Sequence, residues 1–193
     1  MSAAQNVPKT ALRDQLLTAR NRLSLAEVSA AGVAIAEHLL ATPEVRRAAS
    51  VAAYVSIGNE PGTGLLIDGL MAAGKRVILP VLQADDDLDW AAYDGSLTPA
   101  RRGLLEPTGP RLGPDAVATP DVVLVPGLAV GADGMRMGRG GGSYDRALSR
   151  VPVGTFTCVL LYDDERVVGV PAEPHDRRVT AAVTPSGLHR FTG

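Results

Sequence analysis

The feature that most constrains the fold of this chain is a series of short apolar segments, rich in β-branched residues, that alternate with stretches of helical spacing. The clearest segment is VVLV at residues 122–125. It lies between Pro120 and Pro126 and is apolar throughout, which is typical of a strand covered on both faces. Further strands are predicted at residues 50–57, 76–81, 88–93, 155–161 and 179–183.

Helices are predicted before and between these strands. Residues 9–22 and 25–40 carry apolar side chains at intervals near 3.6, and in the first of them Lys9, Arg13, Arg20 and Arg22 occupy the remaining faces. Ser24 and Glu27 form the pattern of a capping box at the start of the second helix. Pro43 favours a further short turn. Helices are also predicted at residues 64–73, ended by Gly74, and at residues 144–149.

Strands that alternate with helices predict an α/β fold, with a mostly parallel sheet flanked by helices in three layers. A chain of 193 residues is about one domain in length, and no linker that could separate two cores is visible. Residues 1–193 are therefore expected to form a single domain. Residues 94–119 are rich in proline and glycine and are predicted to be loop or extended edge.

The charge and the cysteine content exclude several classes of protein. A formal net charge of −2 argues against a protein that grips nucleic acid by neutralising its phosphates. Cys158 is the only cysteine, so an internal disulfide and a multi-cysteine metal site are excluded. No apolar run approaches the roughly 20 residues of a membrane-spanning helix, and residues 1–9 lack a secretory pattern. We therefore expect a cytoplasmic protein that binds neither nucleic acid nor membrane.

The most informative segment for function is DGMRMGRGGGSYDR at residues 133–146, between a buried strand and a helix. Its glycines let backbone N–H groups approach a ligand, and the following helix adds unpaired N–H groups and partial positive charge. Arg136 and Arg139 add full charge in a geometry that matches phosphate oxygens. The segment predicts a polyphosphate site, although a flexible surface loop is an alternative interpretation of so many glycines.

Two common glycine motifs do not fit this segment. It lacks the lysine of a Walker loop, and Ser143 stands where a dinucleotide-binding fingerprint has its third glycine. The predicted site is therefore neither a Walker NTPase site nor a standard NAD site.

Several other charged residues have both a functional and a structural interpretation. Asp145 and Asp176 could hold Mg²⁺, or they could be a helix N-terminal charge and a solvated loop charge, respectively. Lys9 and Arg13 lie one helical turn apart, on a face that is either solvated or ligand-binding. Glu60 follows the first strand at the sheet edge where ligands bind, but it could equally be a turn residue.

Nucleophilic catalysis by the protein is not indicated. His175 beside Asp176 suggests acid–base chemistry, yet the motif Gly-x-Ser-x-Gly is absent from the sequence and Cys158 lies in an apolar strand. An enzyme acting on a phosphorylated sugar would need an acid–base pair that the sequence does not supply.

Several of these segments together resemble the 5-formyltetrahydrofolate cyclo-ligases, also called methenyltetrahydrofolate synthetases. The resemblance rests on VPGLA at residues 125–129, followed by Gly134-x-Arg136-x-Gly138-x-Gly140-x-Gly142-x-Tyr144-Asp145-Arg146. The elements Lys9-x-x-Leu12-Arg13, Glu60, Glu106-Pro107 and Pro171-x-Glu173-x-His175-Asp176 look similar and occur in the right order. The similarity spans nearly the whole chain.

The resemblance implies a three-layer α/β fold of Rossmann-like topology and an enzyme that converts 5-formyltetrahydrofolate to 5,10-methenyltetrahydrofolate. ATP would be the co-substrate and Mg²⁺ the cofactor, with release of ADP and phosphate. In the family's reaction the formyl oxygen attacks the γ-phosphate and N10 then closes on the activated carbon, so no protein nucleophile is required. The partners would be small-molecule substrates only, and we expect a monomer.

Carried over by position, the resemblance also implies the site residues. The ATP-binding residues would be Lys9, Arg13, Arg136, Met137, Gly138, Arg139, Gly140, Gly141, Gly142, Ser143 and Tyr144, of which Arg139 and Tyr144 would be catalytic. The folate-binding residues would be Val55, Glu60, Arg139, Gly140, Gly141, Gly142 and Ser143. The Mg²⁺ ligands would be Asp145 and Asp176.

The sequence departs from the family pattern in three places. Ser143 replaces the first tyrosine of a usual Tyr-Tyr pair, Met137 replaces a usual leucine, and Val130-Gly131 replace a frequent Phe-Asp pair. Ser143 favours an alternative hypothesis, a non-catalytic module of the same fold that binds nucleotide or folate. ATP binding without phosphate release in the presence of folate would distinguish that module from an enzyme.

Overall fold

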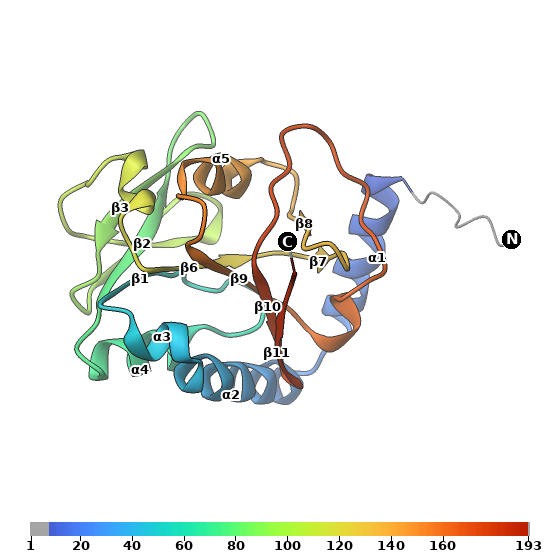
Figure 1. Cartoon of the computed structure of the whole chain (residues 1–193), viewed down its shortest axis with the longest axis horizontal. Coiled ribbons are helices and arrows are strands. Elements are labelled where there is room, and N and C mark those ends of the chain that lie inside the picture. The colour runs from blue at the N-terminus through green and yellow to red at the C-terminus, as the bar shows by residue number, and fades with distance from the viewer. Residues whose placement is uncertain (1–7, 193) are drawn as a thin grey trace, which may run out of the picture.

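The computed structural model describes residues 8–192 and has a seven-stranded sheet at its centre, with helices on both faces (Figure 1). The α-helices are α1 (Lys9–Asn21), α2 (Leu25–Ala41), α3 (Pro43–Arg47), α4 (Gly64–Ala72) and α5 (Ser143–Arg150). The strands of this sheet are β1 (Ser50–Ala52), β2 (Arg76–Leu82), β3 (Leu88–Ala92), β6 (Val122–Pro126), β9 (Phe156–Leu160), β10 (Ala181–Thr184) and β11 (Gly187–Arg190).

Two small antiparallel pairs and three short 3-10 helices complete the part of the chain that the structure describes. The pairs are β4 (Leu97–Pro99) with β5 (Leu105–Pro107), and β7 (Ala129–Val130) with β8 (Arg136–Met137). The 3-10 helices are η1 (Arg101–Gly103), η2 (Pro114–Ala118) and η3 (Asp163–Glu165).

The strand order across the main sheet is β11-β10-β9-β6-β1-β2-β3. Strands β2, β1, β6, β9 and β10 pair in parallel, while β3 and β11 are antiparallel edges. Numbered along the chain, the parallel strands have the order 2-1-3-4-5, as in doubly wound sheets of the flavodoxin type. The winding reverses between β1 and β6, and ligands bind outside the carboxyl ends of strands at such a point. The predicted three-layer α/β fold with a mostly parallel sheet is confirmed.

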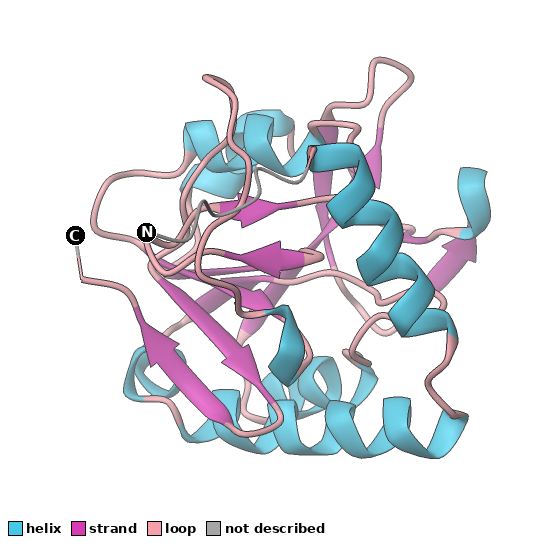
Figure 2. Ribbon diagram, turned by 90° about the vertical axis from the view of Figure 1, so that its right-hand side faces the viewer, coloured by secondary structure: helices cyan, strands magenta, loops and turns pink. Residues whose placement is uncertain are grey.

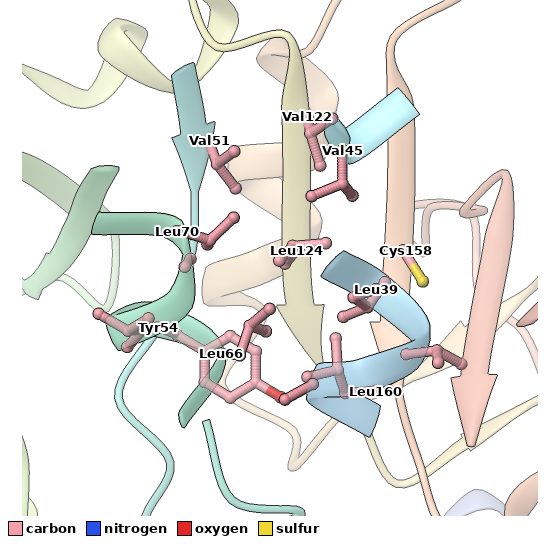
Figure 3. Close-up of a cluster of buried hydrophobic side chains, with 14 of the residues drawn as sticks. Leu39, Val45, Val51, Tyr54, Leu66, Leu70, Val122, Leu124, Cys158 and Leu160 are labelled. Atoms are coloured by element: carbon pink, nitrogen blue, oxygen red, sulfur yellow. The ribbon is translucent and has the colours of Figure 1, made fainter. Parts of the chain in front are cut away.

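Strand β6 shows how the layers are held together, because its side chains alternate between the two faces. Val122 and Leu124 belong to a buried cluster that includes the apolar sides of α2, α3 and α4. Figure 3 shows part of this cluster, with Leu39 and Leu66 beside Leu124. Val123 and Val125 point the other way, into a second cluster that includes residues of α5 and η2. A strand covered on both faces must be apolar at every position, which explains VVLV.

The local signals for helices are confirmed. The Ser24 side chain accepts a hydrogen bond from the Glu27 N–H at 3.1 Å, and the Glu27 carboxylate accepts one from the Ser24 N–H at 3.0 Å, so the capping box is present. Helix α3 begins at Pro43, and α4 is followed by Gly74 at a φ of 76°.

Several predicted boundaries are wrong. The strand expected at residues 50–57 ends at Ala52, because the chain leaves the sheet there and enters the wall of a cavity. Residues 94–119, expected to be loop or extended edge, are mostly irregular, and their extended part is the short pair β4 and β5. The pairs β7–β8 and β10–β11 contain strands too short to show a sequence period, and β7, β8 and β11 were not anticipated.

Helix α1 lies at the edge of the molecule beside β7 and β8 (Figure 1), and it faces the viewer in Figure 2. Its Leu12, Leu16 and Leu17 pack against a small third cluster. Arg20, expected on a polar face of this helix, is only 3% exposed. Within residues 8–192 no single helix is long and apolar enough to cross a membrane, and only the pair α1 and α2, bent by 105°, meets that criterion jointly.

Candidate functional site

A cavity of about 620 Å³ opens at the carboxyl ends of β1, β6 and β2, where the winding of the sheet reverses. Its walls come from segments far apart in the sequence: α1, the chain after β1, the β4–β5 turn, the glycine-rich loop before α5, and residues 173–176. Pockets of this volume and position are typical of small-molecule sites in open α/β sheets.

The glycine-rich loop, residues 138–142, forms one wall of this cavity and leads directly into α5. Gly140 has a φ of 112°, and Gly142, the N-cap of α5, has a φ of 74°. Residues other than glycine rarely adopt these positive φ values, because their Cβ is in the way. The Arg13 Nε donates to the Gly138 carbonyl at 3.1 Å, so α1 contacts the loop. The loop therefore presents main-chain groups and a helix N-terminus to the cavity, as the glycine and arginine pattern predicted.

Arg136 supplies a buried positive charge beside the loop. Its side chain is 4% exposed, its guanidinium lies 5.8 Å from the centre of the Tyr144 ring, and within residues 8–192 its Nε has no hydrogen-bond partner. Burial lowers the pKa of Arg136, whereas Asp145 and Asp176 oppose this shift. A Cβ on Gly138 would lie 2.6 Å from the Arg136 Nη1, so a larger residue there would displace this guanidinium. A buried guanidinium with an unpartnered N–H is a strong attractor for an anionic ligand.

Asp145, His175 and Asp176 gather at the same end of the cavity. Each offers one donor atom, and these atoms lie within 4.8 Å of one another. Asp145 comes from the first turn of α5, where its Oδ1 also accepts the Arg177 N–H at 3.0 Å. Two carboxylates and an imidazole this close together can hold a divalent cation, and oxygen donors are those that Mg²⁺ prefers.

Lys9 at the start of α1 reaches this cluster. Its Nζ donates to Asp176 Oδ2 at 2.7 Å and to Glu173 Oε2 at 3.4 Å. Burial alone would raise the pKa of Asp176, but the bonds from Lys9 and from the Glu173 N–H outweigh it, and the pKa lies below its usual value. Asp176 is therefore ionised at neutral pH and available as a ligand.

Glu60, which follows β1, also lines the cavity and lies beside Arg139 of the glycine-rich loop. It is 7% exposed, its Oε2 accepts the Ile57 N–H at 2.9 Å, and its Oε1 lies 3.7 Å from the Arg139 Nε. Burial raises the pKa of Glu60, and the Ile57 N–H and Arg139 only partly oppose this. A buried carboxylate with spare lone pairs can accept hydrogen bonds from N–H groups of a flat heterocycle.

Two tyrosines, Tyr54 and Tyr144, also belong to the cavity wall. Tyr54 and Tyr144 are arranged edge to face with their ring centres 6.4 Å apart, and both line the cavity. Burial raises the pKa of both phenols, so their hydroxyl groups remain protonated and can donate hydrogen bonds.

The structure brings together nearly all of the residues that the sequence singled out. The exception is Met137, which does not line the cavity; its side chain is 1% exposed and packs in the small cluster beneath α1. The sequence did not indicate the apolar wall of the cavity, which is formed by Pro80, Leu82, Leu88, Leu104 and Leu105. Part of this wall lies in the proline-rich region 94–119, where no period pointed to a site.

Comparison with known proteins places this geometry in a family. Residues 5–185 match the model of the 5-formyltetrahydrofolate cyclo-ligase family. A 5-formyltetrahydrofolate cyclo-ligase of Mycolicibacterium smegmatis is 39% identical over 183 residues, covering 92% of this chain and 93% of that protein. The corresponding protein of Escherichia coli K12 is 33% identical over 165 residues, covering 80% of this chain and 88% of its own.

Solved structures agree with the sequence matches. The NMR structure of Aquifex aeolicus 5,10-methenyltetrahydrofolate synthetase has a TM-score of 0.81 at 27% identity, covering 96% of this chain and 93% of that one. A 5,10-methenyltetrahydrofolate synthetase of Mycoplasma pneumoniae, with a TM-score of 0.74 at 22% identity, has the same fold. The doubly wound sheet, the glycine-rich loop and these matches lead to one conclusion: the chain belongs to the 5-formyltetrahydrofolate cyclo-ligase family of enzymes.

Proposed function

We propose that this enzyme converts 5-formyltetrahydrofolate and ATP to 5,10-methenyltetrahydrofolate, ADP and phosphate. The observation that carries the proposal is the shared cavity, in which the buried Arg136 and the glycine-rich loop face the same space as Glu60 and the apolar wall. Arg13, Arg136 and the main chain of the loop offer donors for phosphates, whereas Glu60 and the apolar wall offer a carboxylate and an apolar surface for a heterocycle. The names of the relatives support the same substrate.

The phosphates of ATP would bind at the loop. Lys9, Arg13 and Arg136 supply positive charge, and the main chain of residues 138–142 supplies N–H groups. The Met137 side chain, which packs away from the cavity, is given no contact with the nucleotide. Lys9 has three N–H donors and can bond to a phosphate oxygen while it keeps Asp176 as a partner.

Asp145 and Asp176 would hold Mg²⁺, since the donor cluster fits a divalent cation. When bound, the ion would neutralise charge on the phosphates. His175 lies close enough to contribute a third donor atom to the ion. From the sequence alone, His175 suggested acid–base chemistry, but no nucleophile motif accompanied it.

Catalysis then requires positioning and charge stabilisation more than a protein nucleophile. The formyl oxygen attacks the γ-phosphorus, and the bond to the ADP oxygen breaks. N10 next bonds to the formyl carbon and loses its proton as inorganic phosphate departs. Arg139 would stabilise the transferring phosphoryl group, the protonated Tyr144 hydroxyl would donate a hydrogen bond, and Glu60 and Val55 would hold the pterin.

The test is the near-ultraviolet absorbance of the methenyl product. Purified protein with ATP, Mg²⁺ and 5-formyltetrahydrofolate should produce it, with one ADP formed for each product molecule. A folded protein that forms neither product nor ADP would refute the proposal. Nucleotide binding in a calorimeter without phosphate release would instead identify a binding module, the alternative that Ser143 favoured.

The wider setting is part of the same proposal. We expect a cytoplasmic enzyme, with residues 1–193 acting as one domain and as a monomer, whose partners are small molecules rather than nucleic acid or membrane. Light scattering coupled to gel filtration should give about the mass of one chain, 20.0 kDa.

A further inference from the structure

A buried ion pair outside the cavity connects two segments that are 145 residues apart. The Arg20 Nε donates to Glu165 Oε2 at 2.7 Å, and an Arg20 Nη donates to Glu165 Oε1 at 2.8 Å. Arg20 is 3% exposed and Glu165 is 4% exposed. Burial alone would lower the pKa of Arg20, but the bond to Glu165 outweighs it and the guanidinium stays charged.

The same guanidinium reaches the edge of the cavity. It donates to the carbonyl of Gly127 at 2.6 Å, and Gly127 lines the cavity just after β6. Arg20 therefore ties α1 both to η3, which carries Glu165, and to the carboxyl end of the central strand.

Tyr162 extends this network to the turn that carries Glu60. The Arg20 guanidinium lies over the Tyr162 ring, 5.6 Å from its centre, and the Tyr162 N–H donates to Glu165 Oε1 at 2.9 Å. The Tyr162 hydroxyl donates to the carbonyl of Asn59 at 2.8 Å, and the next residue is Glu60. One connected set of bonds thus joins α1 to the turn that carries Glu60.

Besides this network, α1 is attached by the bonds of Lys9 and Arg13 at its start and, at its end, by a bond from Asn59 Nδ2 to Asn21 Oδ1 at 3.4 Å. Three leucines anchor it to a cluster of only a few residues, at the edge of the molecule (Figure 2). Lys9 and Arg20 are eleven residues apart, so they lie on about the same side of the helix, about 16 Å along its axis. Fixing Arg20 at one end therefore sets where Lys9 and Arg13 stand at the other.

We infer that Arg20, Glu165 and Tyr162 form a positioning network that holds α1 and the Glu60 turn at the separation which the two ligands of the proposed reaction require. Stability alone does not account for the network, since a buried ion pair is often no more stabilising than apolar residues of similar volume. The expected changes in KM rest on the proposed function. The expected loss of order in α1 and in the Glu60 turn does not.

The kinetic test uses Arg20→Lys and Tyr162→Phe. Lysine keeps the charge but loses the two-pronged bond to Glu165, so the binding-competent arrangement becomes less populated and apparent affinities fall in proportion. We expect KM for both ATP and folate to rise about tenfold, with kcat at saturation within about threefold. Tyr162→Phe removes only the bond to Asn59, and it should raise KM for folate about threefold to tenfold while KM for ATP stays within twofold.

A matched control is Arg150→Lys. Arg150 also forms a two-pronged pair, with Asp87 at 2.7 and 2.6 Å, but neither residue lines the cavity. The KM and kcat values of Arg150→Lys should stay within twofold of those of the wild type. Unchanged KM values in Arg20→Lys and Tyr162→Phe, or an equal change in Arg150→Lys, would overturn the inference. If Arg20→Lys does not fold, Tyr162→Phe decides by its folate KM alone.

Hydrogen exchange provides a readout that does not need the reaction. In the unliganded protein, Arg20→Lys should accelerate amide exchange in residues 9–21 and 57–60, Tyr162→Phe only in 57–60, and Arg150→Lys in neither. If wild-type protein lacks cyclo-ligase activity, the proposed function fails and this pattern still tests the network. Exchange at wild-type rates in both segments of Arg20→Lys would overturn it.

Discussion

At the scale of one residue, Glu60 is a buried carboxylate in the cavity wall whose charge lowers the stability of the folded protein. Its carboxylate is buried and, within residues 8–192, has only one nearby cation, the half-exposed Arg139, whose Nε lies 3.7 Å from Glu60 Oε1. Burial raises its pKa, which means that the charged form is held at a cost. Such groups are typical of binding sites, where a ligand supplies the missing partners.

We therefore expect Glu60→Gln to stabilise the protein at neutral pH. With a folded-state pKa above the unfolded value, the folded protein binds the proton more tightly, and wild-type stability falls as the pH rises from the unfolded to the folded pKa. The amide avoids this loss and can still accept the Ile57 N–H. Tm at pH 7 should rise by about 2–4 °C, or about 1 kcal/mol, and the gain should vanish below the usual glutamate pKa.

Differential scanning calorimetry against pH checks this prediction. Glu37→Gln on the exposed face of α2 serves as the control and should show no pH-dependent difference from wild type. A lower Tm for Glu60→Gln at pH 7 would show that the carboxylate stabilises the fold.

Asp145 is the second residue whose role can be isolated, because asparagine keeps the hydrogen bond from the Arg177 N–H and removes only the charge. We expect Asp145→Asn to fold but to lose turnover by about 100-fold or more, with weaker Mg²⁺ binding in the presence of nucleotide. Steady-state kinetics and Mg²⁺ titration calorimetry measure the two effects. Asp115→Asn, at an exposed carboxylate, should change neither; normal turnover in Asp145→Asn would remove this residue from the metal site.

At the scale of secondary-structure elements, the glycine-rich loop is joined to α5 by one strained position. Gly142 is the N-cap of the helix at a φ of 74°, and no atom lies within 4 Å of where its Cβ would be. A substitution there is disfavoured by backbone conformation rather than by crowding.

Gly142→Ala should consequently lower the stability by about 1 kcal/mol and Tm by about 2–4 °C. Gly141→Ala is the matched control for stability: its backbone is outside the left-handed region, and its Cβ would meet only Ser143 Oγ at an ordinary 3.7 Å. Thermal unfolding of the two variants measures the difference. Equal losses of Tm would mean that the φ at Gly142 is not what constrains this position.

At the scale of the whole molecule, the walls of the cavity include segments that lie outside the central sheet and are far apart in the sequence. Helix α1, the Glu60 turn, the β4–β5 turn and the glycine-rich loop all contribute to its walls. A ligand in the cavity binds the folded chain and not the unfolded one, so it should stabilise the whole protein.

Mg²⁺ with a non-hydrolysable ATP analogue, at about 100 times its Kd, should stabilise the protein by about 2.7 kcal/mol. For a chain of this size that corresponds to a rise in Tm of about 5–11 °C. Thermal shift assays at constant ionic strength measure the effect, and addition of 5-formyltetrahydrofolate should raise Tm further. An unchanged Tm with the nucleotide would contradict an ATP site in this cavity.

The sequence by itself determined the α/β class, the helices and the family. Periodicity, the capping box at Ser24 and the apolar run at residues 122–125 depend on neighbours within a few residues, so they are visible without the fold. The glycine-rich loop could also be predicted from the sequence, because the positive φ values that it needs are adopted by the glycines themselves.

Tertiary structure alone decided where β1 ends, which side chains form the apolar wall, and that Arg20 is buried rather than solvated. After Ala52 the chain stays apolar because it enters a cavity wall instead of a strand, and periodicity does not separate these two environments. The pairings of Lys9 with Asp176 and of Arg20 with Glu165 span 167 and 145 residues. A charged residue on a helix carries no local sign of its partner, so only the packed molecule distinguishes a solvated arginine from one that holds two walls of a site together.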